Sequence, residues 1–484
     1  MNEAIRNLRP RAIWDNFANL NAVPRPSKKE ARVIAFIKQF GEALNLETIV
    51  DAVGNVIIRK PAAQGMEDRK MVTLQSHLDM VHQKNNDTHF DFDKQGIAMY
   101  IDGDWVRAKG TTLGADNGLG VATIMALLQS TAIPHPPLEA LFTIDEETGM
   151  TGAMGLKSGT LKGEILLNLD TEDDDEIGVG CAGGVDVTAV KKYTPAQADG
   201  AANTYKITLK GLRGGHSGMD IAKGLGNANK LMNRLLYKTR NVACLVVLNG
   251  GGLRNAIPRE SVAFVNVLSN NENDFFTELR ATEEKICEEF HNLEPALEIT
   301  TEKVPQKNEQ LPPQTQKQLF NVLYAAHNGV YRMNPDIENL VETSNNIAKV
   351  TVKDGDITIA CLTRSSVASS KKDLATALQA AFELGGFTVS FGGEYPGWAP
   401  NMDSPILKIL DTVYQKLNGE KPKIAACHAG LECGIFARHY PKMDMVSFGP
   451  TIKGAHSPDE RASIASVQKY WAFVKEVLKH VPIK

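Results

Sequence analysis

Three apolar, strand-like runs in the first 170 residues of the chain are each followed within a few positions by ionisable side chains. Met71–Leu74 leads to His77 and Asp79, Leu138–Ile144 leads to Glu146 and Glu147, and Ile165–Leu169 ends at Asp170. Helical patterns alternate with these runs, and such alternation predicts an α/β domain with a largely parallel sheet. In sheets of this kind, sites form beyond the carboxyl ends of the strands. The ionisable side chains are therefore expected at one edge of the sheet.

The alternating pattern is interrupted between residues 187 and 394. This segment has the order β-α-β-β-α-β, which is typical of a ferredoxin-like unit, and a second block of helices and strands follows it. Because 484 residues exceed one ordinary core, two domains are expected. We predict a catalytic domain split into residues 1–186 and 395–484, with a mostly parallel mixed sheet flanked by helices. The insert at 187–394 is predicted to be an α+β lid of two ferredoxin-like halves.

Composition excludes several classes of partner. A net charge of −4 gives no electrostatic reason to expect nucleic acid, and no apolar run is long enough to cross a bilayer. The N-terminal residues contain no apolar core of a signal peptide. The six cysteines are scattered without a Cys-x-x-Cys pair, which favours reduced thiols. We therefore expect a cytoplasmic protein.

Two imidazoles and several carboxylates suit zinc and other borderline divalent ions. His77 and Asp79 lie two residues apart, so both side chains point to one side of a strand end, where Asp79 can orient the ring. Asp116, in Gly-Ala-Asp-Asn-Gly, is either a helix N-cap or a carboxylate that bridges two cations. His456, near the C-terminus, is the candidate for the second nitrogen ligand. A strand-end histidine beside a solvated acid remains the alternative for the first pair.

Glu146 and Glu147 are adjacent, so their carboxylates point to different sides. One can bind a metal while the other accepts a proton from an activated water; a charged strand exit is the alternative. The acids at 172–176 are interpreted as a solvated loop. In the insert, His216 lies in a Gly-rich turn, Arg254 and Asn255 lie at another turn, and Arg364 ends a strand. Cationic and amide side chains at these positions could hold a substrate carboxylate and a developing oxyanion. Ordinary loop polarity is a stronger alternative for Arg254 and Arg364 than for His216.

Five motifs carry a resemblance over essentially the whole chain: QSHLDMV, GTTLGADNG, DEETGMTGA, GGHSG and GAHSPDE. They resemble the co-catalytic zinc amidohydrolases that include peptidase T, aminoacylase and the carnosinases, and within these the bacterial aminoacyl-histidine (Xaa-His) dipeptidases. The resemblance implies one metal ion at His77, Asp116 and Asp170, and a second at Asp116, Glu147 and His456. It further implies roles for four groups: Asp79 orients His77, Glu146 is general base and then acid, His216 stabilises the tetrahedral intermediate, and Asn255 with Arg364 binds the substrate carboxylate.

The resemblance implies a metallo-dipeptidase with two divalent ions, zinc or in its place cobalt or manganese, acting on Xaa-His and other unblocked dipeptides. An N-acyl amino acid amidohydrolase or a broader aminopeptidase on the same scaffold is the alternative, since no residue pattern shows a requirement for a free amine. A catalytically silent scaffold would lack the base or a ligand, and none of these positions is lost here. A homodimer is the usual arrangement of the family.

Overall fold

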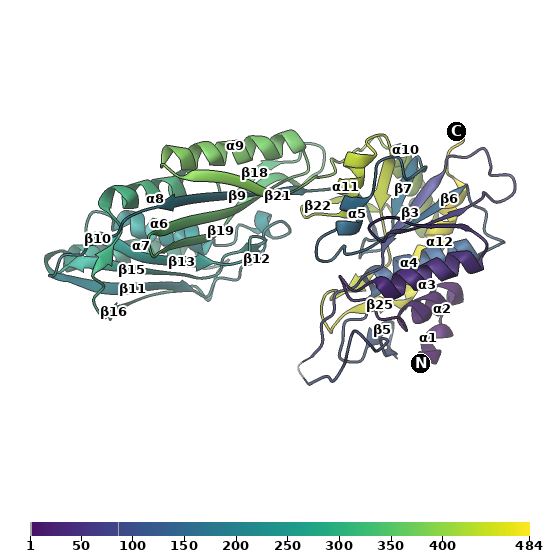
Figure 1. Ribbon diagram of the computed structural model, residues 1–484, viewed down its shortest axis with the longest axis horizontal. Coiled ribbons are helices and arrows are strands. Elements are labelled where there is room, and N and C mark those ends of the chain that lie inside the picture. The colour runs from purple at the N-terminus through teal and green to yellow at the C-terminus, as the bar shows by residue number, and fades with distance from the viewer. Residues whose placement is uncertain (1, 86) are drawn as a thin grey trace. The chain divides into compact units, whose positions relative to one another are not determined.

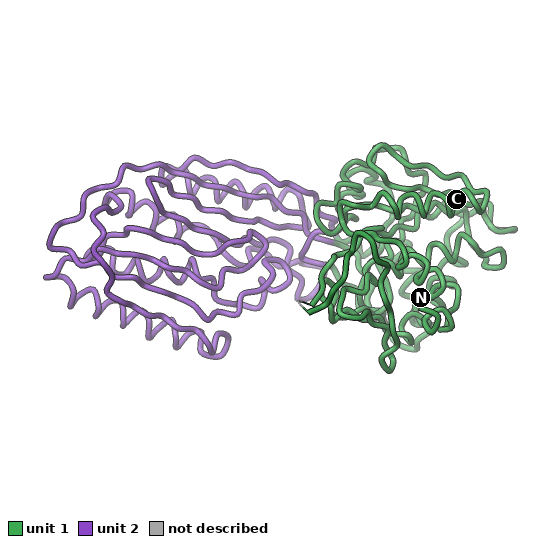
Figure 2. Tube along the Cα trace, turned by 60° about the horizontal axis from the view of Figure 1, so that its bottom comes forward, with its two compact units in different colours: residues 1–180, 400–426, 431–484 green, residues 181–399, 427–430 purple. Residues whose placement is uncertain are grey.

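The computed structural model describes residues 2–85 and 87–484, which form two compact units (Figure 2). Unit 1 comprises the residues up to Gly180 together with Pro400–Ala426 and Leu431–Lys484, and unit 2 comprises Cys181–Ala399 and Cys427–Gly430. The expected insert at 187–394 lies inside unit 2. Unit 2 also includes the four residues 427–430, which the sequence pattern assigned to the second part of the catalytic domain.

Unit 1 is built on an eight-stranded sheet in the order β1-β2-β6-β3-β7-β23-β8-β22. Strands β3, β6, β7 and β22 of this sheet are labelled in Figure 1. Its strands are β1 (Glu47–Val50), β2 (Val56–Lys60), β3 (Val72–His77), β6 (Leu138–Thr143), β7 (Ile165–Asn168), β8 (Glu176–Cys181), β22 (Lys423–Cys427) and β23 (Asp444–Ser447). The four central strands β6, β3, β7 and β23 are parallel, whereas β1, β2 and β8 pair antiparallel to their neighbours. The parallel centre places the carboxyl ends of three site-bearing strands side by side.

Three of these strands, β3, β6 and β7, are buried along their full length, as expected for strands covered on both faces. They include the buried acid Glu139 of β6, and Arg59 pairs with it at 2.8 Å. Helices pack around the sheet: α2 (Arg11–Leu20), α3 (Ala31–Ala43), α4 (Ala115–Gln129), α10 (Pro405–Asn418), α11 (Glu432–His439) and α12 (Ile464–Lys479). Residues 117–128 of α4 are all buried, because this segment is apolar or small around its whole circumference.

Unit 2 contains one extended antiparallel sheet in the order β16-β11-β15-β13-β19-β20-β9-β21. Its strands are β9 (Gly183–Lys192), β11 (Ala202–Lys210), β13 (Ala243–Gly251), β15 (Ser261–Leu268), β16 (Glu298–Val304), β19 (Val341–Lys353), β20 (Asp356–Ser365) and β21 (Thr388–Tyr395). Its longer helices are α6 (Ala228–Lys238), α7 (Glu272–Phe290), α8 (Pro313–Ala325) and α9 (Ala368–Leu384).

The sheet of unit 2 consists of two ferredoxin-like halves. β11-α6-β13-β15-α7-β16 form the first half, and β9, α8, β19, β20, α9 and β21 form the second. The opening strand of the second half, β9, therefore precedes the whole first half in the chain. The α/β class with a mixed sheet in unit 1 and an α+β insert is confirmed. No helix of the described residues is long and apolar enough to cross a membrane.

Candidate metal centre

The predicted residues of unit 1 gather at the carboxyl edge of the parallel strands. His77 is the last residue of β3 and is in register with Thr143, the last residue of β6. Glu146 and Glu147 follow in the turn after β6, and Asp170 stands two residues beyond the end of β7. The parallel register of these three neighbouring strands brings the side chains together.

Asp116 lies between two imidazoles. Its Oδ1 is 3.2 Å from His77 Nε2 and its Oδ2 is 3.1 Å from His456 Nε2. Its backbone (φ −80°, ψ 110°) is not helical, and the peptide bond between Asp116 and Asn117 is cis. No side-chain capping bond forms at this helix start, where Gly114 is the N-cap residue. The carboxylate therefore faces the site, and the N-cap interpretation of Asp116 does not hold.

Three sets of potential ligand atoms each lie within 4.8 Å of one another: His77-Asp116-Asp170, Asp116-Glu147-His456 and His77-Glu146-Glu147. The first two sets share Asp116. His77 Nε2 is 3.5 Å from Asp170 Oδ1, and His456 Nε2 is 3.0 Å from Glu147 Oε2. His456, at 54% side-chain exposure, is much more open to solvent than His77 at 1%.

Asp79 supports the centre from the buried side. Its carboxylate is 3.4 Å from His77 Nδ1, so the Nε2 atom of the ring is the one that faces the other ligands. The same carboxylate accepts hydrogen bonds from Ser27 Oγ (2.8 Å) and from the backbone N–H groups of Glu146 (3.1 Å) and Glu147 (3.3 Å). Burial raises the pKa of Asp79, but the hydrogen bonds from His77 and Ser27 outweigh it and lower that pKa to about 2. Asp79 thus joins the end of β3 to the turn after β6.

The electrostatics of the centre fit a cation site. Burial raises the pKa of Glu146 well above its usual value and that of Asp170 to about 6. Hydrogen bonds with Asp116 and Glu147 raise the pKa of His456 to about 11. Among the described residues, Glu147 Oε1 and Asp170 Oδ1 are buried without a hydrogen-bond donor. Crowded carboxylates with unpartnered oxygens beside two imidazoles are the donor set of divalent ions such as zinc.

The acidic run after Asp170 is not a freely solvated loop. Asp173, Asp174 and Asp175 each pair with a lysine, at distances between 2.5 and 2.9 Å. The sequence interpretation did not foresee these pairs, because the lysines come from positions more than 240 residues away.

His428 and Glu432, one helical turn apart in the sequence, belong to different networks. In unit 1, Glu432 accepts hydrogen bonds from Gln75 Nε2 and Thr143 Oγ1, both at 2.7 Å, and burial raises its pKa to about 8. In unit 2, His428 Nε2 is 2.8 Å from Ser344 Oγ. Burial, with Arg364 and His216 adding to it, lowers the pKa of His428 to about 3.

The remaining predicted residues lie in unit 2. His216 Nδ1 accepts hydrogen bonds from the backbone N–H groups of Gly218 (3.2 Å) and Met219 (3.1 Å), so a neutral ring carries its proton on Nε2. Burial lowers the pKa of His216, and Arg364 lowers it further, which keeps the ring neutral. Gly218 leaves no room for a side chain, because an added Cβ would overlap the backbone oxygen of His428.

Arg364 is buried beside His216. Its guanidinium donates to Tyr395 Oη at 2.7 Å and to Ser217 Oγ at 3.3 Å, and its Nη2 is 3.4 Å from His216 Nε2. Tyr395 and Ser217 were not singled out in the sequence, although Ser217 is part of the GGHSG motif. The structure therefore brings His216 and Arg364 together within unit 2.

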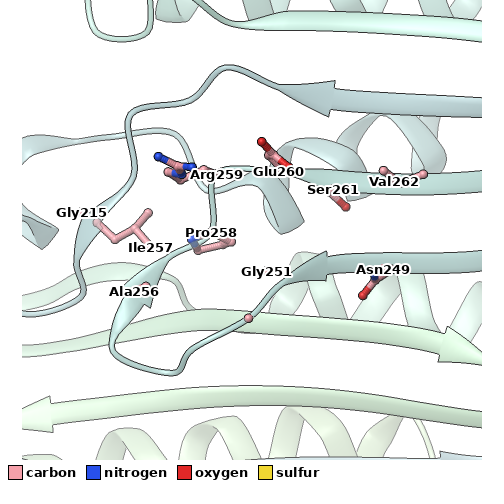
Figure 3. Close-up of a pocket in the computed structure, with 11 residues that line it drawn as sticks. Gly215, Asn249, Gly251, Ala256, Ile257, Pro258, Arg259, Glu260, Ser261 and Val262 are labelled. Carbon is pink, nitrogen blue, oxygen red and sulfur yellow. The ribbon is translucent and has the colours of Figure 1, made fainter. Parts of the chain in front are cut away.

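Asn255 is exposed in the turn before β14 (Ala256–Ile257), which pairs with β12 (Gly215–His216). Its backbone oxygen accepts a hydrogen bond from the N–H of Ser217 at 2.8 Å, which holds this turn against the His216 segment. The guanidinium of the neighbouring Arg254 forms an ion pair with Asp186 at 3.1 Å, which indicates a structural role for Arg254. A pocket of about 380 Å³ opens beside the β12–β14 pair (Figure 3), and no predicted site residue lines it.

Comparison with known proteins places this geometry in context. Residues 73–480 match the family described as peptidase family M20/M25/M40. The chain is 43% identical to the cytosol non-specific dipeptidase of Escherichia coli over 99% of both chains. It is 44% identical to the aminoacylhistidine dipeptidase of Vibrio alginolyticus, whose crystal structure matches with a TM-score of 0.94 over 99% of this chain and 98% of that one. An aminopeptidase from Bacillus cereus, 16% identical with a TM-score of 0.58 over 98% of this chain and 99% of that one, shares the fold.

Proposed function

The chain belongs to peptidase family M20/M25/M40, and we propose that it is a cytoplasmic dipeptidase that works with two divalent metal ions, zinc above all. The single observation that carries the metal assignment is the shared position of Asp116. One carboxylate is within 3.2 Å of two imidazoles, and it belongs to two of the three potential ligand sets.

We assign one ion to His77, Asp116 and Asp170 and the other to Asp116, Glu147 and His456. This arrangement uses five ligands around one shared carboxylate and leaves Glu146 free. The third potential set, with Glu146 and Glu147 together, would use Glu146 as a metal ligand, although Glu146 is the group best suited to proton transfer. The high pKa of Glu146, caused by its burial, supports this choice, because a general base must later deliver its proton as an acid.

Divalent ions bound by these residues would supply Lewis-acid chemistry: they would polarise a scissile carbonyl and lower the pKa of a bound water to about 7. Glu146 accepts the proton of the attacking water and delivers it to the leaving amine. Asp79, through its contact with Nδ1, keeps the Nε2 atom of His77 directed towards the ligands. The neutral His216, with its proton on Nε2, is suited to donate a hydrogen bond to the developing oxyanion.

For the substrate we propose unblocked dipeptides, including Xaa-His, because both full-length relatives carry dipeptidase names. Arg364 and Asn255 are the proposed partners of the C-terminal carboxylate. Arg364 supports this role most directly, because its buried guanidinium lies beside two neutral imidazoles and carries a positive charge that a carboxylate would compensate.

The test compares β-alanyl-histidine and several Xaa-His dipeptides with other dipeptides and with the matching N-acetylated amino acids. We expect the zinc-reconstituted protein to hydrolyse the free dipeptides and to lose this activity in EDTA. Exclusive hydrolysis of the N-acetylated compounds would replace the dipeptidase assignment with an amidohydrolase. Turnover that survives complete metal removal would overturn the metal assignment.

A further inference from the structure

Glu460 is a buried carboxylate that binds the backbone on which Asp116 stands. Its side chain is only 2% exposed. Oε2 accepts the N–H groups of Leu113 (2.7 Å) and Gly114 (2.9 Å), and Oε1 accepts those of Ala115 (2.7 Å) and Asp116 (3.2 Å). Four consecutive backbone donors therefore converge on one carboxylate, and this fixes the path of the chain into Asp116.

Arg25 binds the same segment through a carbonyl. Its Nη2 donates to the backbone oxygen of Gly114 at 2.6 Å, and its Nη1 donates to those of Leu78 and Asp79, both at 3.1 Å. Burial lowers the pKa of Arg25 to about 10, so the guanidinium stays charged at neutral pH. Arg25 consequently joins the segment of Asp116 to the segment that follows His77.

The position of Glu460 in the chain links it to a second ligand. It lies four residues after His456, in a turn closed by the hydrogen bond from its own N–H to the backbone oxygen of Ser457 at 3.0 Å. One side chain thus connects two ligand-bearing segments about 340 residues apart in the sequence. Burying a charge is costly unless hydrogen bonds or an opposite charge compensate it, and here four backbone N–H groups donate to the carboxylate while the charge of Arg25 attracts it.

We propose that Glu460, together with Arg25, is a positioning residue that holds the Asp116 segment so that its carboxylate can serve both ions. This inference rests on the proposed function, because it gives Asp116 the role of shared ligand. Glu460 itself is not a ligand, since both of its oxygens are taken by backbone N–H groups. Its influence on the ions passes through Asp116 and His456.

A second buried glutamate provides the matched control. Glu294 in unit 2 is 1% exposed and accepts the N–H groups of Arg213 (2.7 Å) and Gly226 (2.8 Å), but the segments that it joins carry no proposed ligand. Glutamine at either position keeps the shape and one acceptor oxygen, whereas its amide nitrogen cannot accept a hydrogen bond. Each variant loses hydrogen bonds from backbone N–H groups. Only in Glu460→Gln do these groups lie in a segment that carries a proposed metal ligand.

The experiment measures zinc binding to metal-free, full-length wild type, Glu460→Gln and Glu294→Gln by chelator competition. We expect Glu460→Gln to bind at least one of the two ions about 10- to 100-fold more weakly, the usual effect of losing support behind a ligand. Its dipeptidase activity should recover when free zinc is raised. Glu294→Gln should bind both ions with wild-type affinity.

Equal zinc affinities in the three proteins would overturn the inference and leave the proposed function intact. Wild type that binds fewer than two ions would overturn the proposed function and the inference with it. If Glu460→Gln does not fold, hydrogen exchange on metal-free wild type still tests the geometry. The amides of residues 113–116 should be protected without metal, because their acceptor belongs to the protein, and exchange at unprotected rates would contradict the proposal.

Discussion

At the scale of single residues, the two adjacent glutamates of the centre differ in their side-chain contacts. Glu147 Oε2 lies 3.0 Å from His456 Nε2, whereas Glu146 belongs to neither of the two potential ligand sets that share Asp116. Neutralising the two carboxylates should therefore have different effects, on turnover for Glu146 and on metal affinity for Glu147.

Glu146→Gln should retain both zinc ions and lose turnover by about 100- to 10,000-fold, the range that a general base contributes. Glu147→Gln should lose affinity for one ion, and excess zinc should partly restore its activity. Steady-state kinetics together with zinc analysis of the dialysed proteins distinguishes the two. A Glu146→Gln protein that retains full activity would refute its role as the base.

His428 should make stability dependent on pH. The buried ring has a pKa of about 3 in the folded protein and about 6.5 when unfolded. As the pH falls below 6.5, the unfolded chain binds a proton that the folded chain refuses, so stability is lost, by at most about 1.4 kcal/mol per pH unit for this group. Urea unfolding of metal-free protein at pH 7 and pH 5 should show a smaller loss in His428→Gln than in wild type. Identical losses would mean that His428 is not held neutral.

The sequence points to the proposed ligands and to Asp79 behind His77, but not to the two residues that bind the backbone beneath the centre. Strand ends and motif spacing point to His77, Asp116 and Asp170. Nothing in a single sequence shows that Glu460 binds a loop almost 350 residues earlier, or that Arg25 reaches the backbone of Asp79. Such contacts form only on tertiary folding. Because nearly all residues carry the same backbone groups, the identity of a residue does not show whether a distant side chain binds its backbone.

At the scale of elements, a chain of buried polar groups crosses the ends of the parallel strands. Thr143 of β6 and Gln75 of β3 donate to Glu432, Asn168 of β7 donates to Gln75 at 2.5 Å, and Ser447 of β23 donates to Asn168 at 2.5 Å. The strand period of two places Gln75 on the same side of β3 as His77. This polar chain should hold the strand ends in register beneath the ligands.

Thr143→Val should destabilise the protein by about 0.5–1.5 kcal/mol, because it removes one of the two hydrogen bonds to the buried Glu432 Oε2, leaving only that of Gln75, while keeping the side-chain shape. Urea unfolding of metal-free protein gives the value. Thr412→Val on the exposed face of α10 is the control, since the hydroxyl of Thr412 donates within its own helix, to the backbone oxygen of Lys408. A difference below about 0.5 kcal/mol between the two variants would count against a structural role for the polar chain.

The elements themselves were largely predictable. The apolar runs gave β3, β6 and β7, and the β-α-β-β-α-β order gave the first ferredoxin-like half, because both signals are local. The second half was predicted only in part, because its first strand, β9, lies before the first half in the chain. β9 pairs with β20 and β21, about 170 residues or more later. No local sequence pattern indicates that two strands so far apart in the chain will pair.

At the scale of the whole molecule, each unit has its own buried core. Trp14, Phe17 and Leu119 belong to a core cluster of unit 1, and Leu245 and Ile359 belong to the core of unit 2. All proposed metal ligands are in unit 1. Metal binding should therefore stabilise one unit selectively.

Calorimetry should show two unfolding transitions in metal-free protein, and zinc should raise the midpoint of only one. An ion present at 100 times its dissociation constant adds about 2.7 kcal/mol. Asp170→Asn should abolish most of this shift, because it removes one ligand. A single transition that zinc shifts as a whole would show instead that the two units unfold together.

The most direct test of the account is anomalous diffraction at the zinc edge from crystals of the zinc-loaded protein. We expect two peaks, one contacted by His77, Asp116 and Asp170 and the other by Asp116, Glu147 and His456, with Glu146 outside both coordination shells. A single peak, or a peak with Glu146 among its ligands, would contradict the shared role of Asp116 or the role of Glu146 as the base.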